Sequence, residues 1–589
     1  MTGTQTLNPP MARVDNLRVE FRSRAGVVRA VEDLSFDIRP GETLCIVGES
    51  GSGKSVSALS LMRLVEFGGG QIAGGQIAVD GTALQQAPER AMRHLRGNKI
   101  SMIFQEPMTA LNPVFTIERQ LTEGLRLHRA MSRAQARAEA LKLLSDVRVP
   151  EPERRLRQYP HELSGGMRQR VVIAMALACQ PKLLIADEPT TALDVTTQAE
   201  ILFLMDRLRR DHGTAVVFIT HDMAVVAQMA DRVVVMQDGR KVEEGAVEDI
   251  FANPQENYTK QLLNAVPRLG SMRGKPAKAK TGAPLLRVAG LTTRYPVKSG
   301  LLRRVTSQVH AAQDVSFTLQ AGETLALVGE SGCGKSTVGR SILRLEDPQQ
   351  GQVEMDGSDI LTLTGEPLRQ ARRAMQMIFQ DPFSSLDPKL KIGVQLAEPM
   401  QNFGIGTSQE RAEKAAGLMD RVHLPRDYLS RYPHQLSGGQ RQRVAIARAL
   451  ALDPKLIVAD EALSALDVSV QARVLDLMEE LQRDLDLAFL FISHDMAVVE
   501  RISHRVAVMY LGRIVEIGPR DAVFERPQHA YTKALLSAVP VPDPTQRRKT
   551  LPDYKPIPSP LHPLGHEPEP SRYEEVAHRH HVLISHSGY

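Results

Sequence analysis

The stretch "TLCIVGESGSGKS" (residues 43–55) decides the fold of this chain. Its first part is apolar and rich in β-branched residues, which is typical of a buried strand, and it runs directly into a glycine-rich loop. The loop fits the pattern G-x-x-x-x-G-K-[ST], in which backbone N–H groups surround phosphates and a helix begins just behind them. A buried strand, a phosphate loop and a helix in this order predict an α/β fold with a largely parallel sheet.

The same stretch returns as "TLALVGESGCGKS" (residues 324–336). Other pairs keep a nearly constant separation: Asp187 and Asp460 are 273 residues apart, and so are His221 and His494. So long a period indicates a duplicated domain rather than a solenoid. We expect four parts: a first domain at 11–267, a flexible linker at 268–284, a second domain at 285–540, and a poorly ordered tail at 541–589.

Composition places the chain among soluble globular proteins. It has 589 residues, of which 42% are hydrophobic and 24% charged, with a formal net charge of +5. This charge excess is small for such a length, so we expect no nucleic-acid partner. The N-terminal residues lack the apolar core of a signal peptide, and the most apolar run, residues 171–179, is about half as long as a membrane span. We therefore expect no membrane-spanning segment.

The two glycine loops carry the phosphate chemistry. Their glycines let the backbone close tightly around an anion, and the lysines, Lys54 and Lys335, reach the β- and γ-phosphates. The hydroxyls of Ser55 and Ser336 are expected to bind Mg²⁺. The residues expected to contact nucleotide here are Gly48, Ser50, Gly51, Gly53, Lys54 and Ser55, and in the second copy Gly329, Ser331, Gly332, Gly334, Lys335 and Ser336.

Acidic residues follow a second set of buried strands. In the first copy Asp187 ends the run "LLIAD", where a carboxylate can hold Mg²⁺. Glu188 follows directly and can polarise the water that attacks the γ-phosphate. His221 follows the run "VVFIT" and can contact the same phosphate, although a lone histidine is more often structural. The second copy repeats these positions as Asp460, Glu461 and His494.

Two further stretches, "LSGGMRQR" (163–170) and "LSGGQRQR" (436–443), resemble the signature of ATP-binding cassette (ABC) proteins. The glycine loops, the acid pairs, the "ALD" runs and the histidines follow in the order of that family. The resemblance implies two P-loop nucleotide-binding domains, each with a RecA-like α/β core, an antiparallel β subdomain and a helical subdomain. It also implies a head-to-tail sandwich, with each ATP between one copy's glycine loop and the other copy's signature.

The resemblance assigns further site residues. It implies that Phe21 and Tyr295 stack on adenine, although an aromatic at a strand end is often part of the core. It implies that the glutamines of the two "MIFQ" runs, Gln105 and Gln380, take part in the Mg²⁺ site. The signature residues that would face the γ-phosphate of the opposite copy's ATP are Ser164, Gly165, Gly166, Ser437, Gly438 and Gly439.

The segments "NPQENYTKQLLNAVP" (253–267) and "RPQHAYTKALLSAVP" (526–540) close the two copies. They resemble the closing segments of the ATPases of dipeptide, oligopeptide and nickel importers. Residues 299–311 and 491–520 resemble fused importer ATPases of the glutathione type in Gram-negative bacteria. This resemblance implies ATP-driven import of glutathione or another small peptide, two transmembrane channel subunits, a periplasmic solute-binding protein, and a place on the cytoplasmic face of the inner membrane.

Several alternatives remain open at this point. The substrate can be a di- or oligopeptide or another small solute. A soluble tandem cassette working on ribosomes or DNA is disfavoured by the short linker and the lack of zinc-binding cysteines, and an exporter by the closing segments. Among cofactors we expect ATP and Mg²⁺ but no iron–sulfur cluster, because no cysteine follows Cys333. Cys333 itself lies in the second glycine loop, near a helix start, where a thiol pKa can fall.

The runs "ADEPTTALDV" (186–195) and "ADEALSALDV" (459–468) raise the question of whether the second copy is a degenerate site. Ala462 and Leu463 replace Pro189 and Thr190. These changes affect loop rigidity and packing, whereas the ionisable side chains are all retained. The sequence therefore predicts two equivalent ATP sites.

Overall fold

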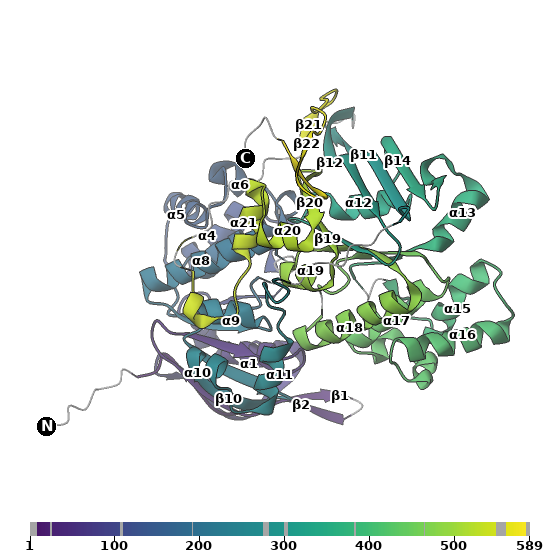
Figure 1. Cartoon of the computed structure of the whole chain (residues 1–589). Helices are drawn as coiled ribbons and strands as arrows, with labels where there is room; N and C mark the ends of the chain where they lie inside the picture. Colours follow the sequence, from purple (N-terminus) through teal and green to yellow (C-terminus); the bar gives the residue numbers. More distant parts are fainter. Residues whose placement is uncertain are drawn as a thin grey trace.

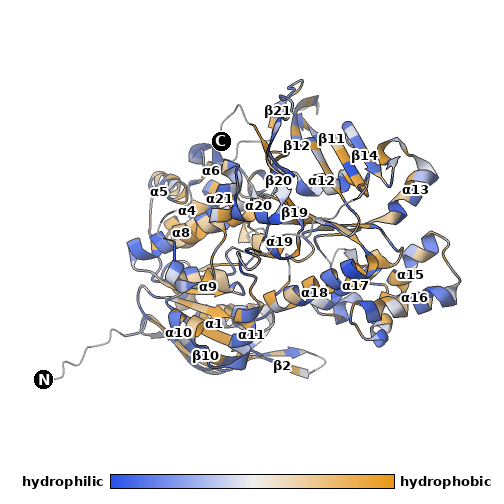
Figure 2. Cartoon of the chain, viewed as in Figure 1, coloured by the Kyte–Doolittle hydropathy of each residue, from blue (hydrophilic) through white to orange (hydrophobic). Residues whose placement is uncertain are grey.

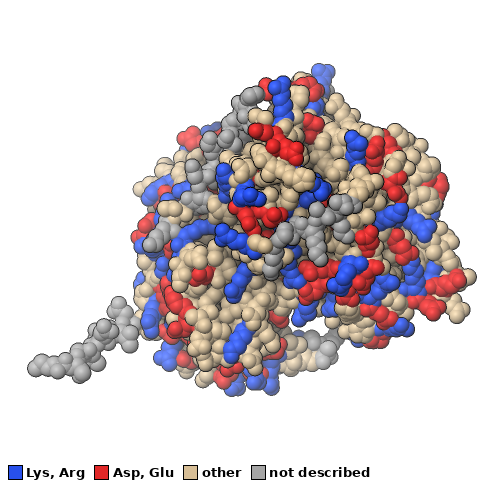
Figure 3. Space-filling view, in the orientation of Figure 1, with Lys and Arg blue, Asp and Glu red and all other residues tan. Residues whose placement is uncertain are grey.

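The computed structural model describes residues 9–23, 26–105, 110–190, 193–274, 282–299, 304–381, 385–464, 466–548, 550 and 561–584. Two copies of one α/β unit lie against each other, the first in purple and blue and the second in teal and green (Figure 1). Within the described ranges, no helix is both long and apolar enough to cross a membrane. Acidic and basic side chains are interspersed on the face that Figure 3 shows, so this face offers no extended basic patch for nucleic acid.

The core sheet of copy one has six strands in the order β10-β9-β3-β8-β7-β6. Their bounds are β3 Thr43–Val47, β6 Ile100–Ile103, β7 Leu183–Asp187, β8 Ala215–Thr220, β9 Arg232–Gln237 and β10 Arg240–Ala246. All pairs are parallel except that of β9 with β10. Every residue of β3, β7 and β8 is buried, which explains why these strands are continuous apolar runs rather than alternating ones.

The core sheet of copy two repeats this order and extends it, as β16-β17-β18-β13-β19-β20-β23-β22. The bounds are β13 Thr324–Val328, β16 Met375–Ile378, β17 Leu456–Asp460, β18 Ala488–Ser493, β19 Arg505–Tyr510, β20 Arg513–Pro519, β22 Tyr573–Ala577 and β23 His580–Leu583. The last two strands come from the C-terminal tail. The expected α/β core with a largely parallel sheet is therefore present in both copies.

Each copy also has an antiparallel sheet packed beside its core sheet. In copy one the order is β2-β1-β4-β5, with β1 Ala12–Ser23, β2 Gly26–Ile38, β4 Gly70–Val79 and β5 Thr82–Ala83. In copy two the order is β15-β14-β11-β12-β21, with β11 Leu286–Ser299, β12 Arg304–Leu319, β14 Gln350–Met355, β15 Ser358–Asp359 and β21 Leu561–Pro563. Among the described residues, a tail strand joins the antiparallel sheet of copy two but not that of copy one.

Helices surround the sheets and turn their apolar faces inward (Figure 2). Those of copy one are α1 Lys54–Leu61, α2 Glu89–Leu95, α4 Ile117–His128, α5 Arg133–Asp146, α6 Pro152–Leu156, α7 Gly165–Leu177, α8 Val195–His212, α9 Met223–Met229, α10 Val247–Ala252 and α11 Asn257–Ala265. Those of copy two are α12 Lys335–Ile342, α13 Gly365–Ala374, α15 Ile392–Asn402, α16 Ser408–Arg421, α17 Gly438–Leu450, α18 Val468–Leu485, α19 Met496–Ile502, α20 Arg520–Glu525 and α21 Ala530–Ala538.

The two copies share apolar contacts through α8 and α18. Val195 and Ala199 of α8 belong to the hydrophobic core of copy two, and Val468 of α18 packs against the core of copy one. The closing helices cross in the same way, since α11 contacts α18 and α21 contacts α8. The interface is therefore reciprocal, with each copy presenting the same pair of helices to the other.

The structure differs from the expected poorly ordered tail at residues 561–584. There β21 pairs with β12, and β23 pairs with β20. His580 fixes the second contact, because its buried Nε2 lies 2.8 Å from Oε1 of Glu516. Open sheet edges supply unpaired backbone groups, so a polar segment without apolar periodicity can still become a strand there. The predictions for residues 549, 551–560 and 585–589 lie outside the described residues.

The expected linker is described only in part, because residues 275–281 lie outside the described ranges. Its first residues contact copy two: Gly270 N–H donates to Glu500 and Gly274 N–H donates to Glu525. The regular elements on either side end at Ala265 in α11 and resume at Leu286 in β11.

Candidate nucleotide sites

Each glycine loop leaves the carboxyl end of a central strand and leads into a helix. Gly48 and Gly53 have φ values of 154° and 95°. A Cβ on Gly48 would lie 2.2 Å from Met236 O, and a Cβ on Gly53 would lie 2.5 Å from Ala30 O. Any larger side chain would therefore displace the backbone around the loop. The N-terminal N–H groups of α1, which starts at Lys54 without a capping side chain, are left to bind an anion.

The loop lysines are buried and hold the loop from inside. Lys54 Nζ donates to the carbonyl oxygens of Gly48 and Glu49, both at 2.7 Å. Lys335 repeats this with Gly329 and Glu330, at 2.8 and 2.9 Å. Burial lowers the pKa of Lys54, which the nearby Glu188 and Asp467 oppose. Both lysines therefore stand inside their loops, and their contact with the β- and γ-phosphates stays a prediction.

A serine and an aspartate meet behind each loop. Ser55 Oγ donates to Asp187 at 3.0 Å, and Ser336 Oγ donates to Asp460 at 2.7 Å. Burial raises the pKa of Asp187 to about 6 and raises that of Asp460 as well. A buried carboxylate beside a hydroxyl is a donor set that fits Mg²⁺, because the cation would supply the missing positive charge.

A carboxylate-rich metal centre is not part of this arrangement. Among the described residues, no group of three or more His, Cys, Asp or Glu side chains could hold a metal ion.

Glu188 lies between a glutamine and a histidine. Gln105 Nε2 donates to Glu188 Oε2 at 2.9 Å, and His221 Nδ1 lies 3.0 Å from Glu188 Oε1. Burial lowers the pKa of His221, but the hydrogen bond and charge of Glu188 outweigh it and the pKa is raised. Glu188 itself has φ of 46°, so its left-handed backbone turns the side chain away from the line of β7.

Copy two has the same triad with slightly different distances. Gln380 Nε2 donates to Glu461 at 2.6 Å, and His494 Nδ1 lies 3.4 Å from Glu461 Oε1. Burial raises the pKa of Glu461, yet hydrogen bonds and charges from His494, Lys335 and Gln380 lower it overall, so this carboxylate is ionised. Glu461 also has φ of 46°. The structure thus brings together the predicted glutamine, glutamate and histidine in both copies.

The aspartates of the two "ALD" runs cross between copies. Asp467 of copy two accepts a hydrogen bond from Ser50 N–H of copy one at 2.9 Å, and Asp194 of copy one accepts one from Ser331 N–H of copy two. Burial raises the pKa of Asp194, while the charge of Lys335 opposes that shift. Each phosphate loop is therefore in contact with the opposite copy, which makes both sites composite.

The signature serines start the helices that follow them. Ser164 Oγ accepts from Met167 N–H and caps α7, and Ser437 Oγ accepts from Gln440 N–H and caps α17, both at 3.3 Å. The glycines of both signatures, predicted with them, form the first helical turns: Gly165, Gly166, Gly438 and Gly439. Their contact with the γ-phosphate of the opposite copy's ATP stays a prediction.

The two aromatic candidates lie on the antiparallel sheets. Phe21 of β1 pairs with Val28, and Tyr295 of β11 pairs with Val309. Phe21 also packs against the core of copy one and closely against Gly70. Both residues are half-buried, so part of each side chain is accessible. Adenine stacking stays a prediction for both.

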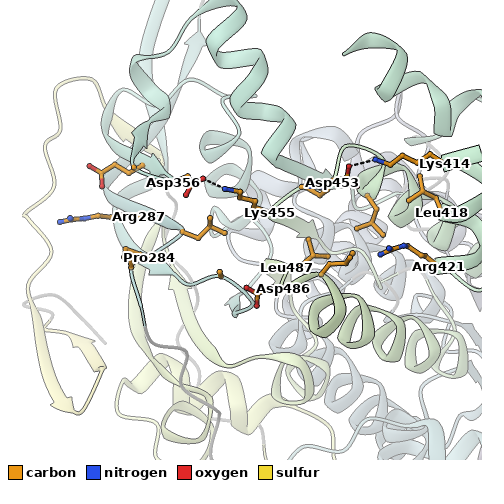
Figure 4. A pocket seen from close by; sticks show the side chains of 18 of the residues that line it. Pro284, Arg287, Asp356, Lys414, Leu418, Arg421, Asp453, Lys455, Asp486 and Leu487 are labelled. Carbon is orange, nitrogen blue, oxygen red and sulfur yellow. Dashed lines mark hydrogen bonds and ion pairs between the residues drawn. The ribbon is translucent and has the colours of Figure 1, made fainter. Parts of the chain in front are cut away.

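A cavity also lies away from the glycine loops. It measures about 1020 Å³ and is lined by residues of copy two that include Leu418 and Arg421 of α16. Figure 4 shows Lys455 paired with Asp356 across one end, at the position just before β17. Phosphate loops follow the carboxyl ends of parallel strands, whereas this cavity lies at their amino ends. It is therefore not the nucleotide site.

Sequence reasoning missed some residues at the sites and raised one possibility that the structure does not support. Glu49 and Glu330 each contact the opposite copy through their side chains. The only available signal was that "GES" occurs in both loops.

Cys333 is buried, and burial raises the pKa of its thiol more than the nearby Lys335 lowers it. The neutral thiol is favoured, so the helix start does not activate this cysteine.

Comparison with known proteins agrees with this geometry. The family model described as "ABC transporter" matches residues 31–191 and 312–464, which contain both glycine loops and both acid pairs. The chain belongs to the ABC transporter family. A second model, described as "Oligopeptide/dipeptide transporter, C-terminal region", matches residues 242–289 and 515–564, so each ABC domain is followed by this region.

Curated relatives of this ABC protein match it nearly from end to end. A "Glutathione import ATP-binding protein GsiA" of Pectobacterium atrosepticum is 55% identical and covers 97% of this chain and 96% of the relative. One of the same name from Escherichia coli O157:H7 is 52% identical over 98% and 97%. A solved dimeric ATP-binding cassette, described as a post-hydrolysis state bound to ADP and Pi, is 30% identical, covers 40% of this chain and 99% of its own, and has a TM-score of 0.37.

Proposed function

We propose that this ABC ATPase drives the import of glutathione or another small peptide by hydrolysing ATP at two composite sites. The observation that carries the proposal is the duplicated set of glutamine, glutamate and histidine, joined to the opposite copy through Asp194 and Asp467. The relatives named as glutathione import proteins span the whole arrangement, which supports this substrate class.

The chemistry at copy one follows from the positions of its side chains. The loop N–H groups and Lys54 bind the β- and γ-phosphates and orient them for in-line attack. Ser55, Gln105 and Asp187 would hold Mg²⁺, which supplies positive charge to the phosphates when bound. Glu188 orients the attacking water and accepts its proton.

The histidine keeps that carboxylate in place. Because His221 Nδ1 bonds one oxygen of Glu188 and Gln105 Nε2 bonds the other, the carboxylate has little rotational freedom. Its remaining lone pairs can face the water. The same reasoning applies to His494, Glu461 and Gln380 in copy two.

Closure of the sandwich would convert binding into work. Each glycine loop already contacts an aspartate of the other copy, so nucleotide bound there lies at the interface between copies. ATP adds negative charge that both halves bind, and loss of phosphate after hydrolysis removes that shared ligand. The proposed cycle is therefore closure with ATP and opening after hydrolysis.

Two equivalent grooves suit a pair of channel partners. In copy one a groove between α2 and α4 is lined by Arg90, Arg93 and Leu127 among others. In copy two the groove between α13 and α15 is lined by residues that include Arg372 and Phe403. Each is basic and apolar, so it complements a short amphipathic helix with acidic residues. We assign one membrane channel subunit to each groove. Binding to these subunits would hold the ATPase at the cytoplasmic face of the inner membrane. A periplasmic binding protein would select the substrate.

Uptake of labelled peptides tests the function. Cells lacking the gene should lose glutathione uptake, and the wild-type chain should restore it while the Glu188→Gln chain should not. Undiminished glutathione uptake together with a lost dipeptide would move the substrate to the dipeptide class. That second candidate is favoured by the two matches to an oligopeptide and dipeptide transporter region.

The groove assignment has its own test. Exchanging Arg93 and Arg369, which line the two grooves, for glutamate should release the chain from membranes that contain the channel subunits. The ATPase activity of the purified chain should persist, because neither residue lies at a phosphate loop. Retention on the membrane would contradict the assignment of these grooves to the channel.

A further inference from the structure

In each copy, one tyrosine of the closing helix reaches the glycine loop. The hydroxyl of Tyr258, in α11, accepts a hydrogen bond from Glu49 N–H at 3.1 Å. In copy two the hydroxyl of Tyr531, in α21, accepts one from Glu330 N–H, also at 3.1 Å. The closing segments therefore touch the second residue of each phosphate loop, although more than two hundred positions separate them in sequence.

The side chain of the same glutamate reaches the opposite copy. Ser469 of α18 donates a hydrogen bond to Glu49, and Thr196 of α8 donates one to Glu330. Both hydroxyls lie in the first turn of their helices, where the positive end of the helix dipole favours a carboxylate. The glutamate of each loop thus bonds the closing helix of its own copy through its backbone N–H, and it bonds the opposite copy through its side chain.

These contacts are enclosed to different degrees in the two copies. Tyr531 is fully buried, and Glu330 and Thr196 are each 4% exposed. Tyr258 and Glu49 are only half-buried. Burial raises the pKa of both tyrosines, so both phenols stay neutral and keep their hydroxyl groups. A hydrogen bond lost from a buried site costs more than one lost near water, so the effect should be larger for Tyr531.

We propose that Tyr258 and Tyr531 are positioning residues for ATP-driven closure. Each tyrosine fixes the backbone of its glycine loop, so that the adjoining glutamate meets the helix of the opposite copy and Ser50 or Ser331 meets the opposite aspartate. The region that follows each ABC domain is then part of the ATP site rather than only a cover for it. This inference rests on the proposed hydrolysis at composite sites.

The first test removes one hydroxyl and keeps the ring. In the full chain, Tyr531→Phe should raise the ATP concentration for half-maximal hydrolysis by about three- to tenfold, with kcat changed by less than about twofold. Tyr258→Phe should do the same with a smaller shift. Tyr428→Phe is the matched control, because Tyr428 stacks on Arg431 in the helical subdomain and leaves the loops untouched. Equal shifts in all three variants would overturn the proposal.

A double-mutant cycle tests the link between the copies. Like Tyr531→Phe, Thr196→Val should raise the ATP concentration for half-maximal hydrolysis. The double variant should raise it by less than the product of the two single effects, because both changes act through Glu330. Thr196→Ser keeps the hydroxyl and should restore the wild-type response. Independent effects, or no effect of Thr196→Val, would overturn the proposal.

Two controls keep the outcomes separate. Thermal unfolding of each variant should stay close to that of the wild type, and if Tyr531→Phe fails to fold, Tyr258→Phe and Thr196→Val still decide the matter. A wild-type chain that does not hydrolyse ATP would instead contradict the proposed function, before any tyrosine is changed.

Discussion

The two nucleotide sites hold the same glutamine, glutamate and histidine, but different residues follow the glutamate in each copy. Copy one has Pro189 and Thr190 after its proposed catalytic glutamate, where copy two has Ala462 and Leu463, and all four residues are buried. The histidine-to-glutamate distance is 3.0 Å in copy one and 3.4 Å in copy two. The ionisable groups occupy equivalent strand ends despite these changes. The positions of the proposed catalytic groups therefore depend on the strand ends, and the loop that follows can vary.

The largest test of this comparison exchanges the catalytic glutamates. Glu188→Gln and Glu461→Gln should each lower the kcat of the whole chain by about 100-fold or more, because the altered site loses its general base and its unhydrolysed ATP keeps the two copies closed. ATP binding should persist, because the loop N–H groups and the loop lysines, rather than these carboxylates, are proposed to bind the phosphates. Phosphate release measures the effect, and Glu123→Gln, exposed on α4, serves as the control.

A smaller loss is expected from the histidines. His221→Ala and His494→Ala each remove one of the two described side-chain partners that hold the glutamate. Hydrolysis should fall by about ten- to 100-fold in each, with the greater loss at copy one, where the contact is shorter. Initial-rate measurements on both variants compare the sites. A loss confined to one histidine would show that the two triads are not equivalent.

The tail contributes to a histidine cluster in copy two that makes stability depend on pH. His310 of β12 lies against His562 and His566, with ring centroids 4.6 and 5.8 Å away. Burial, together with Arg294 and these two rings, lowers the pKa of His310 to about 4, while the charge of Glu567 opposes the shift. Below about pH 6.5 the unfolded chain binds a proton here that the folded chain does not, so stability falls as the pH falls toward 4.

Replacing this histidine should flatten that dependence. His310→Gln should reduce the drop in unfolding temperature between about pH 7.5 and pH 5 by a few degrees. His423→Gln, at an exposed position, is the control and should leave the drop nearly unchanged. An equal drop in the His310→Gln chain and the wild type would contradict the role of this cluster.

The smallest effect is expected from changes in the loop that follows the glutamate, where Ala462 and Leu463 replace Pro189 and Thr190. Ala462→Pro makes the second loop like the first, and kcat should change by less than about twofold because no ionisable group moves. Leu463→Thr should lower the unfolding temperature slightly, since Leu463 is 4% exposed and packs in the core of copy two. A large change in kcat for Ala462→Pro would mean that loop rigidity controls hydrolysis.

Local motifs explain what could be predicted from the sequence. The strand, glycine loop and helix around Lys54 are contiguous, so their pattern predicts both the fold and the phosphate site. The contact of Glu188 with Gln105 and His221 could be anticipated only because each follows a buried strand of one parallel sheet, whose carboxyl ends meet at one edge.

Long-range contacts of ordinary residues could not be predicted in this way. Nothing local marks Tyr258 or Tyr531 as partners of the glycine loops, because the hydrogen bonds depend on how the closing helices cross the interface. The tail strands were missed for a related reason. Residues 561–584 are polar and lack alternation, and they form strands because β12 and β20 offer open edges.

The nucleotide content of single-glutamate variants tests the central claim that both sites hydrolyse ATP. After loading with Mg²⁺ and labelled ATP and rapid quenching, Glu188→Gln and Glu461→Gln should each retain one ATP, at the altered site, and one ADP, at the intact one. A Glu188→Gln chain that retains only ATP, beside a Glu461→Gln chain that forms ADP, would mean that copy two does not hydrolyse ATP and would contradict the account.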